Sequence, residues 1–252
     1  MGAIPNIAGV IDRRFLINYR IAPEVLVQQL PAPFRLHLVG GYGVAGICVL
    51  RLSQLRPDAF PRAFGIATDN AAHRIAVEWD GPVGICRGVY IVRRDTSSQT
   101  TVHLGGRLFP GVHHRADFEF CELSNRYEVA FKSRRDGART SLSASLASDW
   151  TLDSVFSSLD DASTFFEQSP LGFSPGHRDE KLQGLELCCA NWSVQALQVD
   201  GVFSSFFGDA SRFPPGSVTF DSALIMRDVE SKWLTRTRED PFSVSHKSLQ
   251  FQ

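Results

Sequence analysis

The chain has 252 residues, of which 43% are hydrophobic and 21% are charged, and its formal net charge is −1. These values are typical of a globular protein that is long enough to bury a core without disulfides or metals. The near-zero charge excludes a strong long-range field, so we expect neither nucleic acid nor a membrane as a partner.

The first half of the chain alternates apolar and polar residues, which is the pattern of half-buried strands. Strands are predicted at 10–20, 42–55, 73–80 and 85–93. Between the first two, Pro23 favours a short helix that ends before Pro31. In the third strand, His73 shares a face with apolar residues, whereas Arg74 and Glu78 lie on the opposite face, where they can pair with each other.

The second half continues the alternation. A strand at 112–120 places His114 with apolar residues and His113 with polar ones. The dipeptide Asp136-Gly137 supplies the turn of a hairpin. Ser158 can cap a helix that ends near residue 168. The remaining strands of this half are predicted at 127–131, 140–146, 185–199 and 217–228.

Many short strands and few helices predict a mostly β protein, arranged as an antiparallel sandwich or barrel. We see neither an internal repeat nor a linker, so residues 1–230 are expected to form a single domain. The alternation is lost near the end of the chain, and residues 231–252 are therefore expected to be a C-terminal tail.

The five cysteines include one adjacent pair and no CxxC motif, so neither a disulfide framework nor a zinc knuckle fits. The N-terminus lacks the apolar core of a signal peptide, and no apolar run is long enough to cross a bilayer. We therefore expect a cytoplasmic protein with no cofactor.

Residues 172–176 match the G-x-S-x-G motif of serine hydrolases. In that motif the residue after the serine donates its backbone N–H to the oxyanion. Here this residue is Pro175, which has no N–H. The sequence therefore favours an ordinary loop over a nucleophile elbow.

Four histidines lie in or near predicted strands and are candidates for a pocket: His73, His103, His113 and His114. For His114 the plainest interpretation is a buried, hydrogen-bonded structural residue, and the alternative is a general acid or base. Neighbouring histidines of one strand point to opposite faces, so their spacing gives no reason to predict a metal site.

Arg93, Arg94 and Asp95 end an apolar strand. Two arginines and a carboxylate there can orient an anionic ligand, because a guanidinium forms paired hydrogen bonds with a carboxylate. A solvated turn held by Asp95 is an equally simple interpretation. Apart from four lysines, all basic residues of the chain are arginines, which suits either anion recognition or an ordinary charged surface.

The order of several short motifs resembles the acetoacetate decarboxylase-like superfamily. The segment from Arg14 to Tyr19 precedes a helix and the Leu30-Pro31-Ala32-Pro33-Phe34 turn, like the opening of that superfamily. The segment 106–114 is similar to its G-[YF]-P-K-K stretch, and 213–218 also fits. The resemblance covers most of residues 10–230, and its nearest form is a branch described as a domain of unknown function.

This resemblance implies a cone-shaped, mostly antiparallel β-barrel with a few flanking helices and an interior cavity. In the decarboxylase, the first lysine of that stretch forms a Schiff base with a keto acid, and the second lowers its pKa. The corresponding positions here are Gly111 and Val112, which carry no amine. Decarboxylation through an imine is therefore not expected.

Two functions from different classes follow. The first is a lyase, hydratase, isomerase or cyclase that uses acid–base chemistry on a small carbonyl compound or enolisable acid. The second is a non-catalytic protein that binds a small metabolite in the same cavity. A homo-oligomer is possible in either case. The expected catalytic residues are His114, Asp95 and Glu78, and the expected substrate-binding residues are Arg94, Arg107, His73, His103, His113 and Tyr90.

Overall fold

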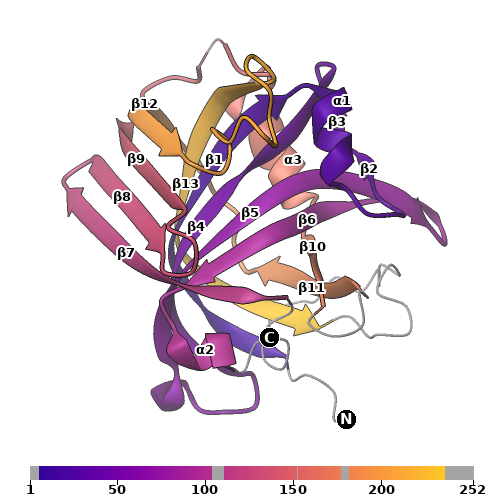
Figure 1. Cartoon of the computed structure of the whole chain (residues 1–252). Coiled ribbons are helices and arrows are strands. Elements are labelled where there is room, and N and C mark those ends of the chain that lie inside the picture. The colour runs from indigo at the N-terminus through magenta and orange to yellow at the C-terminus, as the bar shows by residue number, and fades with distance from the viewer. Residues whose placement is uncertain (1–5, 104–110, 152, 177–181, 236–252) are drawn as a thin grey trace.

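A large curved sheet dominates the computed structural model, which describes residues 6–103, 111–151, 153–176 and 182–235 (Figure 1). The predicted mostly β fold with few helices is confirmed. The strands within these residues are β1 (Ile7–Ile21), β2 (Arg35–Leu36), β3 (Leu38–Val39), β4 (Tyr42–Pro57), β5 (Ile66–Gly81), β6 (Gly84–Thr96), β7 (His113–Leu123), β8 (Arg126–Ser133), β9 (Arg139–Leu146), β10 (Leu171–Pro175), β11 (Leu182–Cys189), β12 (Gln195–Ser204) and β13 (Val218–Thr235).

Helices are short and few in the described part of the chain. They are α1 (Pro23–Leu26), α2 (Gln99–His103) and α3 (Leu159–Glu167), with single 3-10 turns at Val27–Gln29 and Arg62–Phe64. Pro23 stands in the first turn of α1, and the Ser158 side chain accepts a hydrogen bond from the Asp161 backbone N–H at the start of α3. Both predicted helix starts are confirmed.

Strand β1 lies at the centre of the sheet, between β13 and β4. On the β4 side the pairing continues through β5 to β6, and from β6 it returns to β13 through β7, β8, β9 and β12. The strands therefore close into a ring of pairings. Most pairs are antiparallel, but β6 pairs in parallel with both β7 and β10. Parallel neighbours need a crossover connection, and α2 lies in the connection between β6 and β7.

The two faces of the central strands are both buried. Phe15, Ile17 and Tyr19 of β1 lie in the main hydrophobic core, while Leu16 between them lies in a second cluster. Phe166 of α3 belongs to that second cluster, so α3 covers this face of the sheet (Figure 1). Side chains of a strand alternate between faces, and even-numbered positions of β1 therefore point toward α3.

Three local predictions are corrected by the structure. The predicted strand at 185–199 is two strands, β11 and β12, separated by residues 190–194. The G-x-S-x-G segment is not a loop, because residues 171–175 form β10 and pair with β6 and β11. Arg74 and Glu78 do not pair with each other: Arg74 donates to Asn18, and Glu78 lies beside Arg35.

At the C-terminal end, β13 continues to Thr235, and the last described residues of the predicted tail therefore pair with β1 and β11. Among the described residues, no helix is long and apolar enough to cross a membrane.

Candidate functional site

One row of residues crosses the sheet beneath α3. Strand register places Leu16 opposite Cys48, Cys48 opposite Ala72, and Ala72 opposite Arg94. Cys48 and Ala72 have small side chains, so the middle of the row leaves space between the sheet and α3. Cross-strand neighbours of this kind have Cβ atoms only about 4.5–5.5 Å apart.

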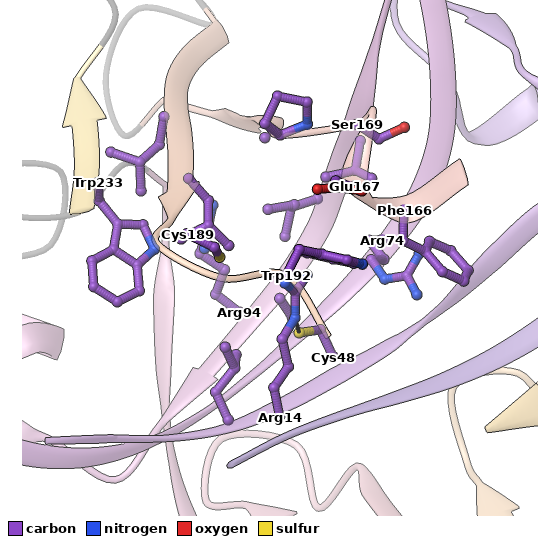
Figure 2. A pocket seen from close by; sticks show the side chains of 18 residues that line it. Arg14, Cys48, Arg74, Arg94, Phe166, Glu167, Ser169, Cys189, Trp192 and Trp233 are labelled. Atoms are coloured by element: carbon purple, nitrogen blue, oxygen red, sulfur yellow. Dashed lines mark hydrogen bonds between the residues drawn. The ribbon is translucent and has the colours of Figure 1, made fainter. Parts of the chain in front are cut away.

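Two further arginines lie next to this row, on either side of Cys48. Arg14 of β1 pairs with Leu50, and Arg74 of β5 pairs with Gly46, so each lies diagonal to Cys48. Diagonal neighbours on one face are within reach of long side chains. Arg14, Arg74 and Arg94 thus project from three different strands toward the same space (Figure 2).

These three arginines line a cavity of about 180 Å³, which we call the arginine pocket. Its walls are mainly apolar, with Phe166 of α3 and Trp192 of the segment between β11 and β12 among them (Figure 2). Glu167, at the end of α3, also lines the pocket and is exposed to solvent. Such a space, apolar with a few charged groups, is typical of a small-molecule site.

Each arginine of the pocket is held by neutral groups. Arg14 donates from Nε to the Cys48 sulfur at 3.0 Å. Arg74 donates from Nη2 to Asn18 Oδ1 at 2.6 Å, and its guanidinium lies 4.5 Å from the centre of the Phe166 ring. Arg94 donates from Nε to Ser174 Oγ at 3.0 Å. These contacts fix the guanidinium planes but do not neutralise their charge.

The arginine pocket carries a net positive charge, because three guanidinium groups and one carboxylate, that of Glu167, line it. Among the described residues, no carboxylate forms an ion pair with Arg14, Arg74 or Arg94. Nε and Nη1 of Arg74 and Nη1 of Arg14 are buried and have no hydrogen-bond partner. Burial lowers the pKa of Arg74 and of Arg94 to about 10, so both stay protonated at neutral pH.

Gly111, the position at which the resemblance places the Schiff-base lysine, lies beside the arginine pocket. Its φ of +91° favours glycine, and a Cβ there would lie 2.7 Å from Ser174 Cβ and 3.4 Å from Arg94 Nε. Lys132 and Lys232 are described by the structure, and neither lines the pocket. Lys181 and Lys247 fall outside the described residues. Within the described part, no amine therefore faces the pocket.

Of the predicted anion-binding group, Arg94 reaches the pocket, whereas Arg93 and Asp95 form a separate ion pair. Asp95 is fully buried and accepts from Arg93 Nε at 2.7 Å and Nη2 at 3.0 Å. Arg93 also donates to Asp136 at 2.6 and 3.0 Å. The arrangement joins the end of β6 to the hairpin turn between β8 and β9, and it matches neither an open rim nor a solvated turn.

The predicted acid–base residues do not meet in the arginine pocket. His114 is partly exposed, lies 3.2 Å from Arg135 Nη1, and has its pKa lowered chiefly by burial. Glu78 lies beside Arg35, with 3.7 Å between Oε1 and Nε. Asp95 borders a second, smaller cavity of about 70 Å³, which it shares with Arg94.

The other predicted binding residues are dispersed. His113 borders the smaller cavity, and it is buried although the alternation places it on the polar face. His73 and Tyr90 are buried in the main core, on the opposite face from the arginine pocket. Arg107 and the side chain of His103 lie outside the described residues. In the described part, no group of three or more metal-ligating side chains is found.

Known proteins resemble this chain in sequence family and in fold. The model of the family DUF2071, described as an uncharacterized conserved protein, matches residues 11–203. No curated protein matches the chain.

Three solved structures are similar over most of their length. An acetoacetate decarboxylase-like enzyme from Sphingomonas wittichii RW1 has a TM-score of 0.56 and 13% identity, covering 92% of this chain and 91% of that one. Acetoacetate decarboxylase from Legionella pneumophila has a TM-score of 0.53 and 12% identity, covering 91% and 84%. The enduracididine biosynthesis enzyme MppR, solved with pyruvate, has a TM-score of 0.53 and 10% identity, covering 93% and 89%. These likenesses establish a fold shared with enzymes that act on small molecules.

Proposed function

The chain belongs to the family DUF2071, and from that premise we propose that its arginine pocket binds a small organic acid and that the protein acts on this acid without forming an imine. One observation carries the proposal. Three guanidinium groups line a single, mostly apolar cavity, and none has a carboxylate partner among the described residues. A buried charge without a partner costs folding free energy, whereas a bound carboxylate would complete its hydrogen bonds.

The walls of the pocket restrict the acid to one with an apolar body. Phe166 and Trp192 offer aromatic surface, and Leu185 and Ile91 add aliphatic surface. A cavity of about 180 Å³ suits a molecule of few heavy atoms. The solved complex of MppR with pyruvate supports a small keto acid as one member of this class.

The expectation that no imine forms rests on the lysine positions. The resemblance places Gly111 and Val112 where the decarboxylase has its two lysines, and no described lysine lines the pocket. A reaction here would depend on charge stabilisation by the arginines and on groups such as Glu167 at the opening.

A non-catalytic binding protein is the second candidate. It is favoured by the position of His114, which does not line the arginine pocket. Both candidates require the same binding, so binding alone does not separate them. Chromatography after incubation with a bound acid does, because only an enzyme converts the acid into a product.

Organic acids are expected to stabilise the protein against heat. At a hundredfold excess over Kd, occupancy adds about 2.7 kcal/mol, which corresponds to a rise in Tm of about 5–10 °C for a chain of this size. Pyruvate, phenylpyruvate and benzoate are the probes, and benzamide is the uncharged counterpart of benzoate. Treatment with borohydride during binding is expected to trap no covalent adduct.

Arg74→Met tests the role of the arginines. This substitution removes a charge-assisted contact, so the affinity for the acids is expected to fall about tenfold or more. Arg126→Met is the matched control, because Arg126 is exposed and pairs with Asp200 away from the pocket. Equal stabilisation by benzamide and benzoate, or unchanged affinity of Arg74→Met, would contradict the proposal.

A further inference from the structure

The sulfur of Cys48 accepts a hydrogen bond from a guanidinium group. Arg14 Nε donates to its sulfur at 3.0 Å. The residue is 4% exposed, and it lines the arginine pocket together with Arg14, Arg74 and Arg94. Its position on the floor of the pocket follows from the row Leu16–Cys48–Ala72–Arg94 across the sheet.

Unpaired donors next to Cys48 provide an independent sign of a ligand. Arg74 is 3% exposed, lines the same pocket, and leaves Nε and Nη1 without a hydrogen-bond partner. Its partner position on β4 is Gly46, two residues from Cys48. The sulfur therefore lies next to the site where the carboxylate of an acid would complete the hydrogen bonds of the guanidinium groups.

We propose that Cys48 is a nucleophile that forms a covalent adduct with organic acids whose electrophilic carbon is adjacent to the carboxylate, such as 2-keto acids. The proposal rests on the proposed function of the arginine pocket as an acid site. Cationic side chains next to a cysteine are the setting in which thiols act as nucleophiles. The same cations hold the carboxylate, so binding brings the adjacent carbon to the sulfur.

The chemistry is balanced without a further reactant. The sulfur of Cys48 bonds to the carbonyl carbon of the keto acid, and the electron pair of the C=O π bond moves to the oxygen. The proton that leaves the thiol is transferred through water to that oxygen, which gives a thiohemiketal. Neither oxidation nor reduction occurs, and the carboxylate stays on the arginines.

The other cysteines offer internal comparisons. Cys121 of β7 is exposed and does not line the arginine pocket. Cys189 lines the pocket from β11, but its sulfur accepts from the Ser231 hydroxyl at 3.7 Å, and burial raises its pKa. Both cysteines line the pocket, so Cys48 differs from Cys189 by its direct hydrogen bond from a guanidinium and not by its accessibility to a ligand.

Alkylation by iodoacetate and by iodoacetamide tests the inference on the full, reduced chain. Both reagents form an S–C bond and release iodide, but only iodoacetate carries a carboxylate next to the reactive carbon. The rate ratio of iodoacetate to iodoacetamide, read for each cysteine by peptide mass spectrometry, is expected to be at least about tenfold higher at Cys48 than at Cys121. Pyruvate should protect Cys48 and leave Cys121 unaffected.

Variants assign the effect to the pocket. Arg74→Met and Arg14→Met are expected to lower the ratio at Cys48 to that of Cys121, whereas Arg126→Met should leave it unchanged. Equal ratios at the two cysteines, no label on Cys48, or a preferred label on Cys189 would overturn the inference. If the acids still stabilise the wild type and not Arg74→Met in that case, the acid site stands and only the nucleophile fails. If the acids stabilise nothing, the proposed function fails as well.

Discussion

Asp95→Ala is expected to lower the free energy of unfolding by about 3 kcal/mol or more, because it leaves a largely buried guanidinium with only half of its partners. Asp95 is fully buried and accepts two hydrogen bonds from Arg93, whose side chain is 11% exposed. After the substitution, Asp136 would be the remaining carboxylate on Arg93, and its side chain is exposed. Urea unfolding followed by circular dichroism measures the difference.

Asp200→Ala is the matched control for this loss. Asp200 pairs with Arg126 at 3.0 Å, and both side chains are exposed, so its removal is expected to cost at most about 1 kcal/mol. Asp95→Asn keeps the shape of the side chain, so its loss in free energy of unfolding should lie between those of Asp95→Ala and Asp200→Ala. If Asp95→Ala were as stable as the wild type but lost turnover of an acid, Asp95 would be a catalytic residue, and its structural role would be wrong.

The strand pattern is readable from sequence where a strand exposes one face to solvent, as β8 and β9 do. The hairpin of β8 and β9 matches the alternation on both sides of its Asp136-Gly137 turn. The alternation misled where its assumption failed. Residues 71–77 of β5 are buried on both faces because α3 covers the second one, so the polar face that the alternation predicts for Arg74 does not exist.

The arginine pocket was only partly predictable, since it depends on strand register. The neighbours of Arg94 in the sequence mark it as a candidate binding residue. Arg14, Cys48 and Arg74 come from three separate strands, and nothing local indicates that they share one face of adjacent strands. A signal existed in the even positions of β1 and β4, yet the pairing that aligns them is a property of the folded sheet.

The histidines show a second limit of sequence reasoning. The alternation within 112–120 placed His114 inside and His113 outside. In the fold, β7 begins with a parallel pairing to β6, where His113 lies opposite Arg94 and is buried. Parallel pairs depend on a crossover that sequence periodicity does not encode.

Below pH 6.5 the protein is expected to lose stability because of His73. The imidazole is 1% exposed and is surrounded by Phe206, Phe207 and Phe131, with ring centres at 4.6, 6.3 and 6.1 Å. Burial, with a smaller contribution from Arg93, lowers its pKa from 6.5 to about 3. The folded state therefore keeps His73 neutral at pH values where the unfolded chain already binds a proton there.

The direction and size of the effect follow from that difference. The stabilising contribution is complete above pH 6.5 and is lost by about 1.4 kcal/mol for each pH unit as the pH falls toward 3. Between pH 6.5 and 5, where most carboxylates have not yet begun to titrate, the loss amounts to about 2 kcal/mol. His73→Leu keeps an apolar side chain in the core and removes the titrating group, so its stability should change less over this window.

Urea unfolding of both proteins at pH 7, 6 and 5 measures the difference in slope. His114→Leu is the matched control, because His114 is partly exposed and its pKa is lowered less, so its removal should flatten the profile only slightly. Parallel profiles for the wild type and His73→Leu would show that water or a proton reaches His73 in the folded state. His73 would then be an accessible ligand-binding residue on the second face of the sheet instead of a neutral part of its core.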